Sequence, residues 1–80
     1  MPASPTPLTL CSARCGQRLR ILCLNGSSQE CARLRELGFC EYSEVCKLTD
    51  GSALLCRLSG SRLALGRELG ARILVEPIAA

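Results

Sequence analysis

Apolar side chains recur at every second position in several short segments of the chain. In Arg18–Leu24, Leu19 and Ile21 fall on one face and Leu22 and Leu24 on the other, which predicts a strand. Asp-Gly and Gly-Ser pairs separate later segments of the same kind, as expected for strands joined by tight turns. The later predicted strands are residues 45–48, 53–58, 62–65 and 73–75.

The segment after the first strand has helical spacing instead. Ser27 and Glu30 have the Ser-x-x-Glu spacing of a capping box, which satisfies two backbone amides at a helix start. Gly38 can take the left-handed conformation that ends a helix, and Phe39 is then expected to pack back on Leu34. The stripe predicted to face inward consists of Cys31, Leu34 and Leu37.

The order of these elements predicts the fold class. One helix follows the first strand, three strands come next, and Gly66–Gly70 is long enough for only a single helical turn before the last strand. We therefore expect a mainly β protein, a small SH3-like five-stranded barrel whose closure removes exposed strand edges. Residues 8–80 form this single domain, and the proline-rich residues 1–7 are expected to be a flexible arm.

Charge and aromatic content narrow the function. The 80 residues carry a net charge of +3, and Phe39 and Tyr42 are the only aromatics. Nucleic-acid modules usually combine a dense basic face with stacking aromatics, so we expect no nucleic-acid partner. Neither a secretory signal nor an apolar run of about 20 residues is visible. We therefore expect a cytoplasmic protein without direct membrane insertion.

The chain lacks the usual components of an enzyme active site. Histidine is absent, which removes the commonest general base and metal ligand. No phosphate-binding Gly-x-x-x-x-Gly-Lys-Ser/Thr loop is present, and no two carboxylates form an obvious catalytic pair. The sequence predicts a protein that is not an enzyme.

The seven cysteines leave one alternative open. Their number is odd and no secretory signal is seen, so thiols are expected, with Cys23, Cys31 and Cys56 acting as small buried apolar residues. Cys11 and Cys15 have the spacing of half a zinc site, and a thiolate site for Fe2+ or Zn2+, or a redox module, is the alternative. Since no second pair has suitable spacing, we favour no cofactor.

The order of short motifs resembles the ferrous-iron transport protein A (FeoA) family from Leu8 to Glu76. Lys47 stands where this family usually has an apolar residue, and Glu41-Tyr42-Ser43 where it often has glycine. The motifs that carry the resemblance are Cys15-Gly16, Arg33-Leu34-x-x-Leu37-Gly38-Phe39, Val45, Leu54/Cys56/Leu58-x-Gly60, Ala64-Leu65 and Ile73-x-Val75-Glu76.

This resemblance implies a role in bacterial iron homeostasis. It suggests an SH3-like adaptor of ferrous-iron uptake that binds the cytosolic part of FeoB, a GTP-binding membrane iron permease. The family is linked to transition metal ion binding, and the same barrel type is appended to metal-dependent repressors. A regulatory module of such a repressor is therefore the related alternative.

Two groups of residues are predicted to contact a partner. Leu22, Leu55 and Leu74 face outward if Ile21, Cys56 and Ile73 face the core, and a cluster of them would mark an interface for docking or self-association. Scattered exposed leucines are also common on monomers. The second group lies at the helix end and in the following loop, and consists of Arg33, Arg35, Leu37, Phe39 and Tyr42.

Overall fold

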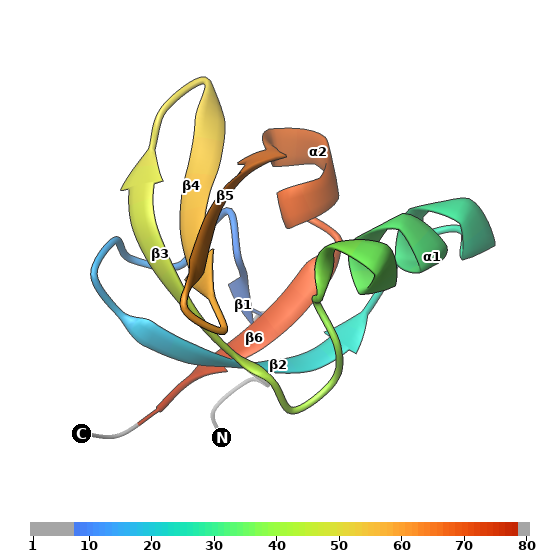
Figure 1. Cartoon of the computed structure of the whole chain (residues 1–80), viewed down its shortest axis with the longest axis horizontal. Coiled ribbons are helices and arrows are strands. Elements are labelled where there is room, and N and C mark those ends of the chain that lie inside the picture. Colours follow the sequence, from blue (N-terminus) through green and yellow to red (C-terminus); the bar gives the residue numbers. More distant parts are fainter. Residues whose placement is uncertain (1–7, 79–80) are drawn as a thin grey trace, which may run out of the picture.

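The computed structural model describes residues 8–78, so the arm predicted for residues 1–7 lies outside the described part. Strands dominate, as expected, and Figure 1 shows them curling around a common interior. The elements are β1 (Leu8–Thr9), β2 (Arg18–Leu24), α1 (Ser28–Leu37), β3 (Glu44–Asp50), β4 (Ala53–Leu58), β5 (Ser61–Gly66), α2 (Arg67–Gly70) and β6 (Ile73–Pro77).

The sheet corrects the prediction of a closed five-stranded barrel. It has six antiparallel strands in the order β1-β6-β2-β3-β4-β5, and within residues 8–78 the outer strands β1 and β5 do not pair. The cause is local, because β1 ends after two residues. The amides of Ser12 and Ala13 both donate to the carbonyl oxygen of Thr9, at 3.1 and 3.0 Å, and end the strand in a turn.

Helix α2 lies at the side of the sheet that strand pairing leaves open, directly after β5 (Figure 1). Leu10, in the loop after β1, is fully buried, and the Cys11 thiol donates to the carbonyl oxygen of Arg67 at the start of α2 (2.9 Å). Gly70 lets α2 lie close to Leu54 of β4 and to Cys11, because a β-carbon at this position would collide with Leu54 and press on Cys11. Packing of the loop against α2 therefore replaces the missing strand pairing.

The core is almost entirely aliphatic. Ile21, Cys56 and Ile73 are fully buried, which confirms the predicted inward faces. Cys23 and Cys31, also predicted to be buried, are only partly so. The other buried apolar residues are Leu10, Ala13, Leu19, Leu34, Phe39, Val45, Leu54, Leu58, Leu65 and Val75.

Helix α1 has the predicted caps. Ser27 and Glu30 form the capping box, in which the Ser27 amide lowers the pKa of the Glu30 carboxyl. Gly38 has φ 107°, and the Phe39 amide donates to the carbonyl oxygen of Leu34 at 2.9 Å. The predicted inward stripe is wrong at Leu37, which is 44% exposed. In this helix only Leu34 is fully buried, because α1 contacts the core along a narrow line.

A β-bulge in β2 changes the predicted faces. Ile21 pairs with Val75, but Cys23 pairs with Leu74, so Leu22 is an extra residue in the strand. After this insertion Leu24 packs against the core, although the simple alternation placed it outward.

Candidate protein-interaction surface

Three of the predicted contact residues lie together on the outer face around this bulge. The Tyr42 amide donates to the carbonyl oxygen of Ile21 (2.7 Å) and the Ile21 amide donates to that of Ser43 (2.9 Å), which continues the β2–β3 pairing and places Tyr42 beside the bulge. Leu74 pairs with Cys23 on the other side of β2. Leu22 is 41% exposed and Tyr42 76%. We call Leu22, Cys23, Tyr42 and Leu74 the Leu22 patch.

The backbone of Tyr42 is unusual for its residue type. Its φ is 70°, in the left-handed region that favours glycine. The family pattern noted above also often has glycine in this loop. A non-glycine residue held there costs of order 1–3 kcal/mol. The ring is 76% exposed, so packing within the described chain offsets little of this cost.

Phe39 and Leu55 do not belong to this surface. Phe39 is fully buried, which corrects its assignment as a partner-binding residue: its ring fills the core beneath the helix end. Leu55 is half-buried and pairs with Thr49, near the opposite end of β3 from Glu44. Since Glu44 pairs with Arg20 next to the bulge, Leu55 lies far along the sheet from Leu22. The three outward leucines therefore do not form one cluster.

The remaining predicted residues surround the end of α1. Arg35 forms an exposed ion pair with Glu41 (3.2 Å), which links the helix to the loop that carries Tyr42. Arg33 and Leu37 line an open groove between α1 and Leu69 of α2. This groove was not predicted, because nothing local in the sequence indicates that α2 lies beside α1.

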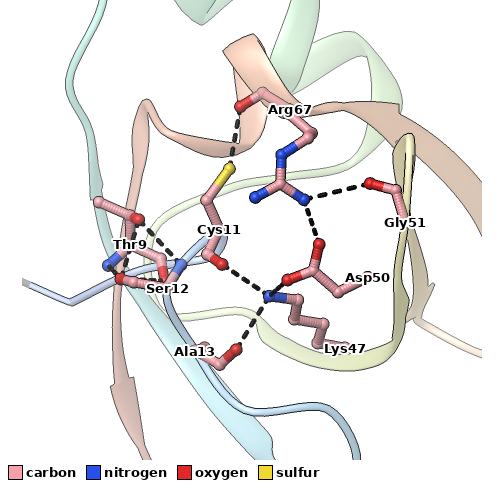
Figure 2. Close-up of polar contacts among 8 residues, drawn as sticks. All are labelled: Thr9, Cys11, Ser12, Ala13, Lys47, Asp50, Gly51 and Arg67. Carbon is pink, nitrogen blue, oxygen red and sulfur yellow. Dashed lines mark hydrogen bonds and ion pairs between the residues drawn. The ribbon is translucent and has the colours of Figure 1, made fainter.

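A second unpredicted feature is a buried cation (Figure 2). Lys47 has no exposed surface, and its Nζ donates to the carbonyl oxygens of Cys11 and Ala13 at 2.7 and 2.9 Å. Its third partner is Oδ2 of Asp50 (2.8 Å), whose other oxygen pairs with Arg67. The ammonium thereby holds the 10–16 loop against β3, and Asp50 links β3 to Arg67 at the start of α2. We call Lys47, Asp50, Arg67 and the Cys11 and Ala13 carbonyls the Lys47 clamp.

Each charged group of the Lys47 clamp has a hydrogen-bond partner within the clamp. Hydrogen bonds from Lys47, and then from Arg67, hold the pKa of Asp50 below its usual range. All three ammonium hydrogens have acceptors, and the described residues contain no buried side-chain nitrogen or oxygen without a partner. Such an arrangement fixes the loop that carries the Cys11 and Ala13 carbonyls.

Cys11 and Cys15, the residues of the thiolate alternative, have different surroundings. Cys15 is exposed, whereas the Cys11 thiol is turned toward the Arg67 carbonyl oxygen. Within residues 8–78 no three histidine, cysteine or carboxylate side chains gather as they would around a metal ion. Burial raises the pKa of the Cys56 thiol to about 11, which disfavours the thiolate that a metal requires. In the same residues, no helix has the length and apolar character to span a bilayer.

Comparison with known proteins gives a family match. A family model described as the FeoA domain matches residues 8–77, nearly the whole chain. No curated protein is detectably similar in sequence.

Solved structures share the architecture. The FeoA protein of Stenotrophomonas maltophilia, solved with zinc and described as a prokaryotic SH3 domain protein, is 25% identical; the match covers 86% of this chain and 89% of that one, with a TM-score of 0.75. A FeoA-like protein from Clostridium acetobutylicum is 16% identical over 96% and 93% of the two chains, with a TM-score of 0.83.

A regulator has the same fold as part of a longer chain. A manganese-dependent transcriptional repressor, solved with manganese, is 18% identical over 94% of this chain but only 38% of its own, with a TM-score of 0.84. At this identity the likeness shows the fold alone. The fold is thus SH3-like, with the open six-stranded sheet described above.

Proposed function

The chain belongs to the FeoA domain family, and from this premise we propose that it is a non-enzymatic accessory protein of ferrous-iron uptake. Its proposed partner is the cytosolic part of an FeoB-type GTP-binding permease, which places the protein in the cytoplasm. The observation that carries the proposal is the Leu22 patch, which exposes an aromatic and an aliphatic side chain near the ion pairs Arg18–Glu44 and Arg20–Glu76 of the outer face. Exposed apolar patches of this kind typically mark protein interfaces.

The patch has the composition of a small binding hot spot. Aromatic anchors carry a large share of binding energy at interfaces, and Tyr42 is the most exposed large apolar residue in the described chain. The flanking ion pairs Arg20–Glu76 and Arg35–Glu41 provide a polar rim. Rim charges mainly affect the rate of encounter, so Arg33 and Arg35 are assigned this lesser role.

We predict that Tyr42→Gly and Leu22→Glu each weaken binding to the permease's cytosolic domain by about ten-fold or more. Glycine removes the ring and tolerates φ 70°, so Tyr42→Gly should not lower the melting temperature. The measurement is a pull-down or titration with the purified cytosolic domain, with and without guanine nucleotide.

Leu55→Glu is the matched control for Leu22→Glu, since Leu55 lies on the same face but far from the patch. It should bind like the unmodified protein. Equal losses from Leu55→Glu and Leu22→Glu would contradict this site, and so would full binding by Tyr42→Gly. Sedimentation of the same variants tests homo-oligomerisation: a dimer broken only by the patch variants would assign the patch to self-association.

We also propose that this role needs no metal held by the chain. Protein purified without oxygen should contain far less than one equivalent of iron or zinc, and Cys15→Ser should not change this content. The physical reason is that Cys11 and Cys15 are joined by no third ligand among residues 8–78. A full equivalent of metal that disappears in Cys15→Ser would contradict the proposal and favour the thiolate alternative.

A further inference from the structure

Two arginines face each other across the β4–β5 hairpin. Arg57 and Arg62 are directly paired in the register, so both side chains project from the outer face, and both are exposed. Like charges directly opposite each other destabilise a sheet. Within residues 8–78 neither guanidinium has a carboxylate partner, so nothing in the described chain offsets this repulsion.

The other arginines of the outer face are arranged differently. Arg18 pairs with Glu44 at 2.8 Å, and Arg20 lies 4.0 Å from Glu76. Both of these carboxylates come from a neighbouring strand. The sheet therefore supplies a cross-strand acid to each arginine of β2 but none to the Arg57–Arg62 pair.

The surroundings of the pair indicate which kind of anion fits. Leu55 and Ala64 are paired with each other two residues along the same face, Leu55 half-buried and Ala64 exposed. This places a small aliphatic surface beside the two positive charges. Neither aromatic residue is paired with these residues: Phe39 is buried, and Tyr42 lies four positions before Cys46, the β3 partner of Arg57. A nucleic acid would find no stacking platform here.

We propose that the Arg57–Arg62 pair is a binding site for an acidic segment of a partner protein. Carboxylates of that segment would lie between the two guanidinium groups, in the role that Glu44 has beside Arg18. An aliphatic side chain next to them would contact Leu55. The site is separate from the Leu22 patch and does not depend on the permease as partner.

The probe for this proposal is a fluorescent peptide of eight alternating glutamate and leucine residues, titrated into the full chain at low salt. We expect saturable binding that weakens as salt rises, because the charges are exposed. The same peptide with glutamine in place of glutamate should bind at least about ten-fold more weakly.

Three variants make the test specific. Arg57→Gln combined with Arg62→Gln should weaken binding of the glutamate peptide by about ten-fold. Arg57→Glu should abolish binding while keeping or raising the melting temperature, because it recreates the Arg–Glu pairing seen at Arg18. Arg18→Gln is the matched control; it removes one positive charge from the same face and should change binding by less than about two-fold.

Several outcomes would overturn the proposal. One is no saturable binding below about 1 mM peptide, and another is equal weakening by Arg18→Gln, which would indicate general charge attraction. Tighter binding through the two arginines to phosphatidylglycerol vesicles, or to a single-stranded oligonucleotide, would assign the site to a membrane or a nucleic acid instead.

Discussion

Replacing Lys47 with alanine is expected to lower the free energy of unfolding by about 3–5 kcal/mol, the range for breaking a buried ion pair on one side. The variant would leave the carbonyl oxygens of Cys11 and Ala13 without the Lys47 donor, and Asp50 with Arg67 as its cationic partner among the described residues. Since a domain of 80 residues is stable by only about 4–12 kcal/mol, this loss is a large fraction of the total. Urea unfolding followed by circular dichroism measures it.

Arg18→Ala is the matched control. Arg18 and Glu44 are separated by the same 2.8 Å as Lys47 and Asp50, but both side chains of the first pair are more than half exposed. Exposed pairs contribute about 0–1 kcal/mol, so Arg18→Ala should have little effect. Comparable losses from the two variants would show that burial of the Lys47 ammonium does not set its contribution.

The same clamp should be visible in the pH dependence of stability. The folded pKa of Asp50 is lowered by Lys47 and Arg67, so its carboxylate stabilises the fold above its unfolded pKa of about 3.9. That contribution is lost as the pH falls through the folded pKa. Unfolding midpoints should therefore decline below about pH 4, and Asp50→Asn should make this decline shallower while being less stable at neutral pH.

Local rules were enough to predict α1 and the hairpins. The capping box at Ser27 and the stop at Gly38 use neighbours within one helical turn, so the sequence pattern contains both partners of each hydrogen bond. The β4–β5 turn at Gly60 is equally local, with φ 81°. These are the elements for which prediction and structure agree most closely.

Features that depend on distant partners were not predictable from such patterns. Strand β1 is defined by pairing of Leu8 with Val75, and the bulge at Leu22 by a register shift against Leu74. Alternation of apolar residues continues through Leu22 unchanged, so the sequence carries no visible mark of the extra residue. The open edge of the sheet and the wrong face of Leu24 both follow from these long-range pairings.

The Lys47 clamp and the Arg57–Arg62 pair show the same difference between local and long-range features. A lysine at position 47 was noticeable as a polar residue in an apolar strand, and Asp50 three residues later was a possible signal of a pair. The other partners of Lys47, the carbonyl oxygens of Cys11 and Ala13, are more than 30 positions away in the sequence. The Arg57–Arg62 pair follows directly from the hairpin register, and a residue-by-residue pairing of that hairpin would have predicted it.

Phe39→Ala is expected to lower the free energy of unfolding by about 3–5 kcal/mol, as much as the Lys47 variant. Phe39 is the largest fully buried side chain of the described residues, and in this small aliphatic core no other aromatic is available to fill its space. For a domain of this size, 1 kcal/mol shifts the melting temperature by about 4–8 °C, so a fall of at least about 12 °C should be seen by thermal denaturation.

Two companion variants separate this packing role from partner binding. Phe39→Leu keeps most of the apolar volume, so its free energy of unfolding should fall by less than about 1.5 kcal/mol. Tyr42→Ala removes an exposed ring, so its free energy of unfolding should change by no more than about 0.5 kcal/mol. Binding to the permease domain should show the reverse order, strong loss for Tyr42→Ala and near-normal affinity for Phe39→Leu at temperatures where it is folded.

If Phe39→Ala kept its melting temperature but lost binding, Phe39 would have to lie on the surface, and the packing of the helix end described above would be wrong. Loss of the Phe39 ring from the core, by contrast, should weaken binding only as the fold itself is lost.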